Sequence, residues 1–329
     1  MVGRGGTGKE VSRVRAKNKL RMKFVIDPYG PKEDAYAQQI ECHHPNCKNH
    51  AINSHMVQRN RFLRRIAEDG KVLQMSDSQM QSLIDEDIPY ELHDLKNAMS
   101  LPVFCAQHDG KLFHKIEQVE PDMTDIKTLL LMSYRAECGV YEQEHRRQLF
   151  YQTNPLYNSF CVGWAFEEQK EHSKAVLKMF EDDINKIHRA IKEGNNDAYA
   201  FVVYDVPFKG ICLSDVVILE SDLISEKEKD VPCLSPLYVH ALPQDNDTTK
   251  VALGYRKDSI NYLIQQIIEN WEKGDYPNRI LELMVIANNW CVSPSYFGEK
   301  TDDMCEWILS KKLHFQFEDE LPFALRDED

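Results

Sequence analysis

Cysteine and histidine side chains occur in two short clusters near the start of the chain, and this pattern constrains the fold more than any other. The first cluster lies in the segment ECHHPNCKNH and the second in the segment FCAQHD. Thiolate sulfur and imidazole nitrogen are the ligands that Zn²⁺ favours, and a structural zinc ion takes four of them in a tetrahedron. Cys42 and Cys47 form one chelating pair, and Cys105 and His108 form a second. We therefore predict one structural zinc ion bound by these four residues, between a turn and the start of a helix.

Other assignments of the same side chains stay open at this stage. The same sequence pattern would arise if the cysteines were buried free thiols and the histidines were incidental surface residues, with no metal bound. His55 is an alternative fourth ligand in place of His108. We expect His43, His44 and His50 to be exposed residues of the turn. We expect His114 to be a partly buried structural residue of the helix.

Composition and charge indicate where such a chain works and what it binds. Nine cysteines in 329 residues are too few, and odd in number, for a disulfide scaffold, which favours a reducing compartment. No apolar run approaches the roughly 20 residues that span a bilayer, and the basic N-terminus lacks the apolar stretch of a signal peptide. We therefore expect a cytoplasmic protein with no membrane partner. Eight Lys or Arg residues between Arg4 and Lys23, against a net charge of −13, predict an arm that contacts phosphates, although a solubilising tail explains them equally well.

Hydrophobic periodicity and turn residues divide the chain into three parts and predict an α+β fold. Residues 1–34 form a basic flexible arm, residues 35–118 a zinc module, and residues 119–329 a helix-rich domain of unknown role with a small antiparallel sheet. The expected strands are 51–55, 71–75, 198–206, 211–219, 237–242 and 250–255. The expected helices are 57–68, a polar segment within 77–97, one that begins at Cys105, 122–147, 160–192, 259–273, 279–289 and 302–312.

A turn with two ligands, a β-hairpin, and a helix whose first turn supplies the other two ligands together describe a treble-clef finger. Cys42-x4-Cys47, then Ser54-His55, then the segment FCAQHD resemble the HNH nuclease family, whose ββα-metal core is a treble-clef variant. The resemblance covers residues 38–118. The chain departs from the family pattern in four places. The first pair has x4 instead of x2, Ser54 replaces an acid, His108 replaces a cysteine, and roughly forty residues separate the strand histidine from the helix, a length that implies an inserted element.

The resemblance implies a metal-dependent endonuclease that hydrolyses phosphodiester bonds. His55 corresponds to the general base, and Asp109 falls where the family places a ligand of a catalytic divalent ion, Mg²⁺ or Mn²⁺. A stand-alone protein of this kind suits bacterial defence or mobile-element biology, by analogy with HNH enzymes. Asp109 also has a simpler explanation, because an acid in the first turn of a helix complements the helix dipole.

Four arginines follow His55 on the expected helix 57–68, and they suit nucleic-acid phosphates beside a nuclease centre. They are Arg59, Arg61, Arg64 and Arg65. A solvated basic face explains them almost as well. The alternative function is a zinc-stapled module that binds nucleic acid or a protein without chemistry. A protein partner or a second copy of the chain would then bind through the domain 119–329.

Overall fold

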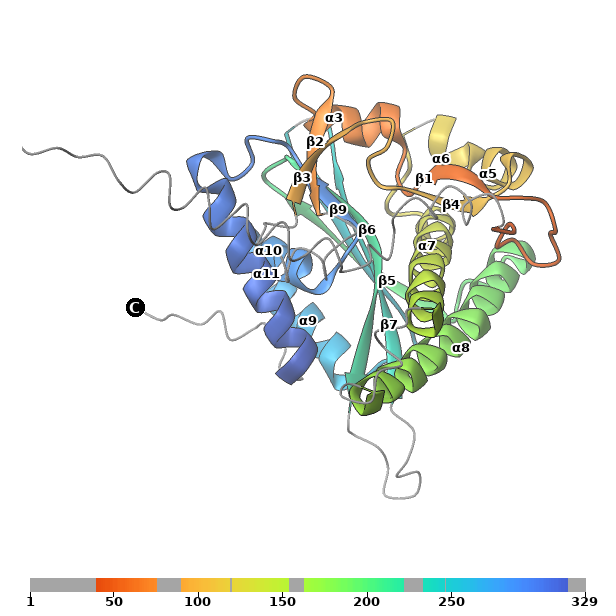
Figure 1. Ribbon diagram of the computed structural model, residues 1–329. Coiled ribbons are helices and arrows are strands. Elements are labelled where there is room, and N and C mark those ends of the chain that lie inside the picture. The colour runs from red at the N-terminus through yellow and green to blue at the C-terminus, as the bar shows by residue number, and fades with distance from the viewer. Residues whose placement is uncertain are drawn as a thin grey trace, which may run out of the picture.

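The computed structural model describes residues 40–75, 90–118, 120–153, 163–221, 233–245 and 247–318. The predicted basic arm, residues 1–34, lies outside this part of the chain. A seven-stranded sheet occupies the centre, with the strand order β3-β2-β9-β6-β7-β8-β5, and every pair of neighbouring strands is antiparallel. Helices cover both of its faces (Figure 1). The fold is therefore α+β with an antiparallel sheet, as predicted, but the sheet is larger than the sequence indicated.

The strands of the sheet include all four that were expected after residue 190. Its members are β2 (Lys71–Met75), β3 (Tyr90–Asp94), β5 (Tyr199–Val206), β6 (Ile211–Ser221), β7 (Cys233–Pro243), β8 (Thr249–Arg256) and β9 (Trp290–Val292). The central strands are buried on both faces. Along β7, Tyr238 and Leu242 pack into one core cluster, whereas Leu237 and Val239 pack into the other. Successive strand side chains point to opposite faces, so a strand covered on both sides appears in the sequence as an uninterrupted apolar run.

Two groups of helices form the outer layers. On one face lie α7 (Ile126–Thr153) and α8 (Gly163–Glu193), and on the other lie α9 (Tyr262–Glu272), α10 (Tyr276–Ile286) and α11 (Thr301–Glu318), with a short 3₁₀ turn, η3 (Gly298–Lys300), before the last (Figure 1). The Asn261 side chain caps α9 by accepting a hydrogen bond from the Ile264 backbone N–H at 3.0 Å. No helix in the described ranges is both long enough and apolar enough to cross a membrane.

A separate two-stranded antiparallel sheet lies next to the predicted metal ligands and contains His55. It pairs β1 (Ile52–His55) with β4 (Ser100–Phe104), and β4 leads directly into α5 (Ala106–Leu112), followed by α6 (His114–Gln118). The register places His55 opposite Ser100. A short π-helix, η1 (Arg59–Leu63), and the single turn α3 (Arg64–Ile66) follow β1, where a helix over 57–68 was expected. This arrangement, called here the ββα unit, comprises β1, β4 and α5.

Two expectations about the segment between β1 and β4 were wrong. The polar segment 77–97 does not end as a helix, because Tyr90–Asp94 forms β3 and pairs with β2 from Met75↔Tyr90 to Lys71↔Asp94. Residues 76–89 lie outside the described part of the chain. The predicted boundary at residue 118 does not separate two sheets, since β2 precedes it and pairs with β9. The segment between β1 and β4 therefore extends the central sheet.

One buried carboxylate in the core makes stability depend on pH. Glu137 on α7 is fully buried, and neither carboxylate oxygen has a hydrogen-bond partner within the described residues. Burial, and then the charge of Asp183, raises the pKa of Glu137 well above its ordinary value of 4.5. Because the folded-state pKa is raised, the stabilising contribution is complete below about pH 4.5 and is lost as pH rises.

We therefore expect Glu137→Gln to unfold at higher urea concentration than wild type at about pH 8, with the difference shrinking toward pH 5. Each unit by which the folded-state pKa exceeds the unfolded one adds about 1.4 kcal/mol to this difference. Glu269→Gln, at an exposed position on α9, is the control and should leave the pH dependence unchanged. Equal pH dependence in wild type and Glu137→Gln would contradict this account.

Candidate metal centre and the adjacent His55 site

A short turn before the hairpin positions the first two cysteines. Asn46, after Pro45, adopts a left-handed backbone conformation with φ of 65°, which asparagine tolerates better than most residues. The Cys47 backbone N–H donates to the His44 carbonyl at 3.0 Å and closes the turn. The His43 backbone N–H donates to the Val103 carbonyl of β4 at 2.9 Å. The turn is thereby fixed against the strand that leads into α5.

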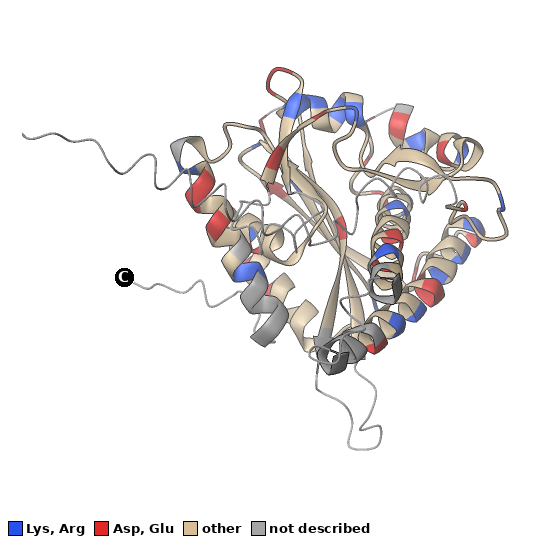
Figure 2. Ribbon diagram, viewed as in Figure 1, with Lys and Arg blue, Asp and Glu red and all other residues tan. Residues whose placement is uncertain are grey.

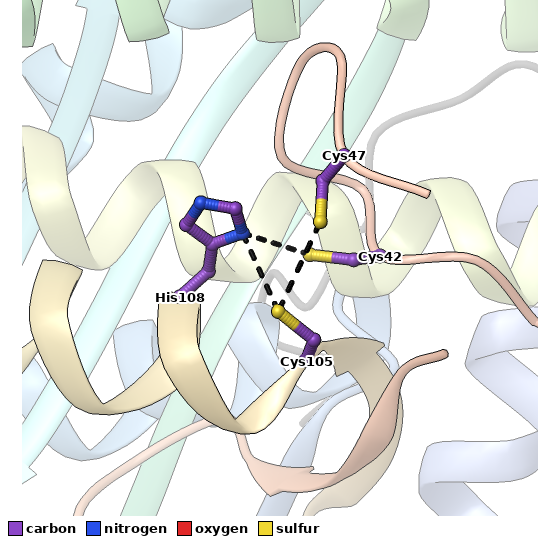
Figure 3. A group of neighbouring side chains, drawn as sticks. All are labelled: Cys42, Cys47, Cys105 and His108. Atoms are coloured by element: carbon purple, nitrogen blue, oxygen red, sulfur yellow. Dashed lines mark hydrogen bonds between the residues drawn. The ribbon is translucent and has the colours of Figure 1, made fainter. Parts of the chain in front are cut away.

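The four predicted ligands converge (Figure 3). Cys105 is the N-cap residue of α5 and His108 lies in its first turn. The sulfurs of Cys47 and Cys105 are 3.9 Å apart, and His108 Nδ1 is 3.4 Å from the sulfurs of both Cys42 and Cys105. All four ligand atoms lie within 4.8 Å of one another. In a tetrahedral zinc site the bond lengths require about 3.8 Å between two sulfurs and about 3.6 Å between sulfur and nitrogen. The group could therefore hold a metal ion such as zinc.

The thiols of this group respond differently to their surroundings. Burial raises the pKa of the Cys42 thiol to about 12. Burial also acts to raise the pKa of Cys105, but hydrogen bonds from the His108 backbone N–H and the Asn49 side chain lower it below its ordinary value. A coordinated cation deprotonates the thiols that bind it. Binding of a metal ion by this group would therefore release the proton of Cys42.

Contacts to the long helices hold the turn in place and correct one expectation. His43 and His44 are not exposed turn residues. His43 Nε2 lies 3.0 Å from Glu142 Oε2, and the Glu142 side chain on α7 is fully buried. The His44 ring stacks on His108, with ring centroids 3.8 Å apart, and lies edge-on to His188 of α8. His50 and His114 are exposed, so exposure was predicted correctly for His50, whereas a partly buried His114 was wrong.

His55 is not part of the ligand group. It ends β1, is half-buried, and its Nε2 lies 3.0 Å from the backbone carbonyl of Leu95. A carbonyl oxygen only accepts hydrogen bonds, so Nε2 must carry the proton. Burial lowers the pKa of His55, and the charges of Arg59 and Arg135 lower it further, while the Leu95 bond and Asp109 act in the opposite direction. A neutral imidazole with Nε2 protonated leaves a lone pair on Nδ1.

Asp109 lies close to His55 but is paired with a cation. Its carboxylate is near enough to Ser54, the residue before His55, for the Ser54 side chain to lower the pKa of Asp109. Arg135 Nη2 on α7 lies 3.4 Å from Asp109 Oδ1 and 2.6 Å from Glu117 Oε1. Burial raises the pKa of Asp109, although Arg135 lowers it. Among the described residues, the only group of three or more ligand side chains within reach of one ion is the Cys3His group, and Asp109 belongs to no such group.

The four predicted phosphate-binding arginines divide into two kinds. Figure 2 shows basic residues gathered on η1 and α3. Arg61 and Arg65 are committed to ion pairs within the chain: both contact Glu120, at 3.3 and 3.0 Å, and Arg65 also contacts Asp245 at 2.7 Å. Arg59 and Arg64 are exposed. An open groove runs beside these arginines and is lined by Gln58, Asn60, Arg61, Arg64, Arg65 and Asp245.

Comparisons with known proteins leave the site to be interpreted on its geometry alone. No protein-family model matches the chain, and neither a curated protein nor a solved structure matches it. The arrangement that any functional account must explain is therefore a Cys3His group beside a half-buried histidine, an acid and a buried arginine.

Proposed function

We propose that this protein is a nuclease whose ββα unit is a treble-clef finger stapled by a structural zinc ion, with His55 as the general base. The observation that carries the proposal is the hydrogen bond between His55 Nε2 and the Leu95 carbonyl, at 3.0 Å. It fixes the tautomer in which Nδ1 is free to accept a proton. A general base must be neutral and correctly oriented before the reaction, and burial of His55 favours the neutral form.

The proposed reaction is hydrolysis of a phosphodiester bond. His55 Nδ1 accepts a proton from water, and the water oxygen forms a new bond to phosphorus. The bond from phosphorus to the leaving oxygen breaks, and that oxygen takes a proton from solvent. Arg59 is exposed and close enough to His55 for its charge to lower the pKa of the imidazole. A guanidinium at this place stabilises the negative charge that develops on the phosphate. The zinc ion contributes by cross-linking the turn to α5.

The arginine groove suits the backbone of a nucleic acid. Gln58 lines the groove, and its side-chain amide donates to the Glu117 carbonyl at 3.0 Å. Glu117 is in turn the partner of Arg135, which contacts Asp109. These contacts link the groove to the His55 site, and the proposal is that a strand lying in the groove brings a phosphate to His55. Arg64, which lines the groove, and Arg59, which is exposed but outside its lining, supply the contacts.

We expect Arg59→Ala/Arg64→Ala to weaken binding to duplex DNA at low salt. The salt slope should fall by about 0.9 for each phosphate that the variant no longer neutralises, or roughly 2 in all. The measurement is the binding constant over a series of salt concentrations. Lys257→Ala/Lys273→Ala, at exposed positions directly after β8 and α9, is the charge-matched control. An unchanged slope in the arginine variant, or an equal change in the control, would show that the groove does not contact phosphates.

The proposal is tested first with wild-type protein that carries its full complement of zinc. Single- and double-stranded DNA and RNA are incubated with it, with and without Mg²⁺ or Mn²⁺, and the products are separated by size. We expect cleavage of at least one of these substrates, with the activity eluting together with the protein on a sizing column. Complete absence of cleavage from all four substrates under every metal condition would refute the nuclease.

A second candidate is a zinc-stapled module that binds nucleic acid without cleaving it. It is favoured by the pairing of Asp109 with Arg135, since the carboxylate is thereby compensated within the protein. The same two assays separate the candidates. Salt-dependent binding through Arg59 and Arg64, together with no cleavage, would establish the second candidate in place of the first.

A further inference from the structure

Arg135 is a deeply buried cation beside the His55 site. Its side chain is 2% exposed, and its guanidinium lies over the Phe113 ring, 3.8 Å from the ring centroid. It bridges two carboxylates, Glu117 at 2.6 Å and Asp109 at 3.4 Å. Arginine stays protonated at any pH at which proteins fold. A permanent positive charge is therefore built in between Glu117 and Asp109, the acid whose charge acts on His55.

This is the place where a catalytic divalent ion was expected on Asp109. Mg²⁺ and Mn²⁺ bind through anionic oxygens, and Asp109 and Glu117 are the acids in position to supply them. Both are already paired with Arg135, and a second cation within a few ångströms of the guanidinium would be repelled. The carboxylates are only 22% and 30% exposed, so solvent screens this repulsion incompletely. The residues present do not fit a divalent ion at this site.

We propose that the Arg135 guanidinium occupies the position where a catalytic divalent ion would bind, so that the His55 site binds no such ion. The part of this inference that concerns catalysis rests on the proposed nuclease function. The part that concerns metal binding does not. Arg135 acts as a positioning residue. It holds Asp109 through the 3.4 Å contact, and its charge helps keep the His55 imidazole neutral.

The first test measures metal binding and needs no activity. Wild-type protein loaded with zinc is titrated with Mn²⁺, and free Mn²⁺ is followed by its electron paramagnetic resonance signal. We expect no saturable Mn²⁺ site in the wild type. Arg135→Gln should gain a site that binds Mn²⁺ roughly tenfold or more tightly than any wild-type binding, because a unit charge leaves the vicinity of two carboxylates. The double variant Arg135→Gln/Asp109→Asn should lose it.

A wild-type protein that binds one Mn²⁺ per chain, with the binding lost in Asp109→Asn, would overturn the proposal. This result needs only the wild type and the near-isosteric substitution Asp109→Asn, so it decides the question even where Arg135→Gln does not fold. Arg135→Lys, which keeps the charge, is the matched control and should gain no Mn²⁺ site. A gain in Arg135→Lys equal to that in Arg135→Gln would also contradict the role given to the charge.

The second test uses cleavage and separates this inference from the nuclease proposal. Zinc-loaded wild type, dialysed free of other divalent ions, should cleave at a rate that Mg²⁺ or Mn²⁺ changes by less than about twofold. Cleavage that appears only when Mg²⁺ or Mn²⁺ is added would overturn the inference and leave the nuclease standing. No cleavage under any condition would refute the nuclease, and the Mn²⁺ titration would still decide whether Arg135 excludes the ion.

Discussion

Cys105→Ala should abolish metal binding and unfold the ββα unit. Purified wild type is expected to contain about one zinc per chain, and this variant close to none. Cys105 joins β4 to α5, and its sulfur lies 3.9 Å from that of Cys47. Its loss leaves His108 as the one ligand that α5 supplies, so the set of four is incomplete. Because metal-binding free energy in such units is largely folding free energy, the free energy of unfolding should fall by about 3–5 kcal/mol.

Metal content by mass spectrometry and urea unfolding in the same preparations measure both effects. Cys305→Ala is the matched control, since Cys305 is also a buried free thiol but lies in the other core cluster, on α11. It should keep its zinc and lose only about 1 kcal/mol. Zinc at full stoichiometry in Cys105→Ala, or none in freshly purified wild type, would show that this group is not a metal site.

His55→Ala should lower the single-turnover cleavage rate by about 10²- to 10⁴-fold, the range in which removal of a general base reduces catalysis. Zinc content and the urea midpoint should stay close to those of wild type, because the His55 side chain contacts the Leu95 carbonyl and none of the four ligands. The rate is measured with enzyme in excess over a labelled substrate, so that product release does not limit it.

His114→Ala is the control for this experiment, because His114 is an exposed histidine on α6. Its cleavage rate should equal that of wild type. A His55→Ala protein that loses its zinc would mean that the imidazole belongs to the metal site. An equal loss of activity in both variants would mean that the assay reports general damage to the unit.

The metal ligands could be predicted from the sequence because each pair is local. Cys42 and Cys47 lie in one turn, and Cys105 and His108 in one helical turn, so spacing alone brings each pair together. Five of the seven strands of the central sheet, β2 and β5 to β8, were also predicted. A strand buried on both faces appears as a short apolar run. The sequence favoured His108 as the fourth ligand and left His55 as an alternative; in the structure His108 joins the group, and His55 contacts the Leu95 carbonyl instead.

Other parts of the site depend on contacts that the sequence does not mark. The hydrogen bond from His55 goes to the backbone carbonyl of Leu95. Because every residue has a backbone carbonyl, the sequence does not identify Leu95 as the acceptor. β9 is three residues long and begins shortly after α10, so the apolar pattern of that helix masks it. Arg135 did leave a signal. It stands with Glu137 inside the apolar run LLLMSYRAECGVY, and charges in such a run indicate buried ionic partners.

The most direct test of the account is chemical rescue of His55→Ala by imidazole in solution. The variant, with zinc content equal to wild type, is assayed under single-turnover conditions at increasing imidazole concentration. If His55 is the general base, the residual rate is low and rises in proportion to the concentration of unprotonated imidazole. N-ethylmorpholine, a buffer base too large for the vacated position, should not restore it. Cleavage by His55→Ala at the wild-type rate, with no response to imidazole, would contradict the account.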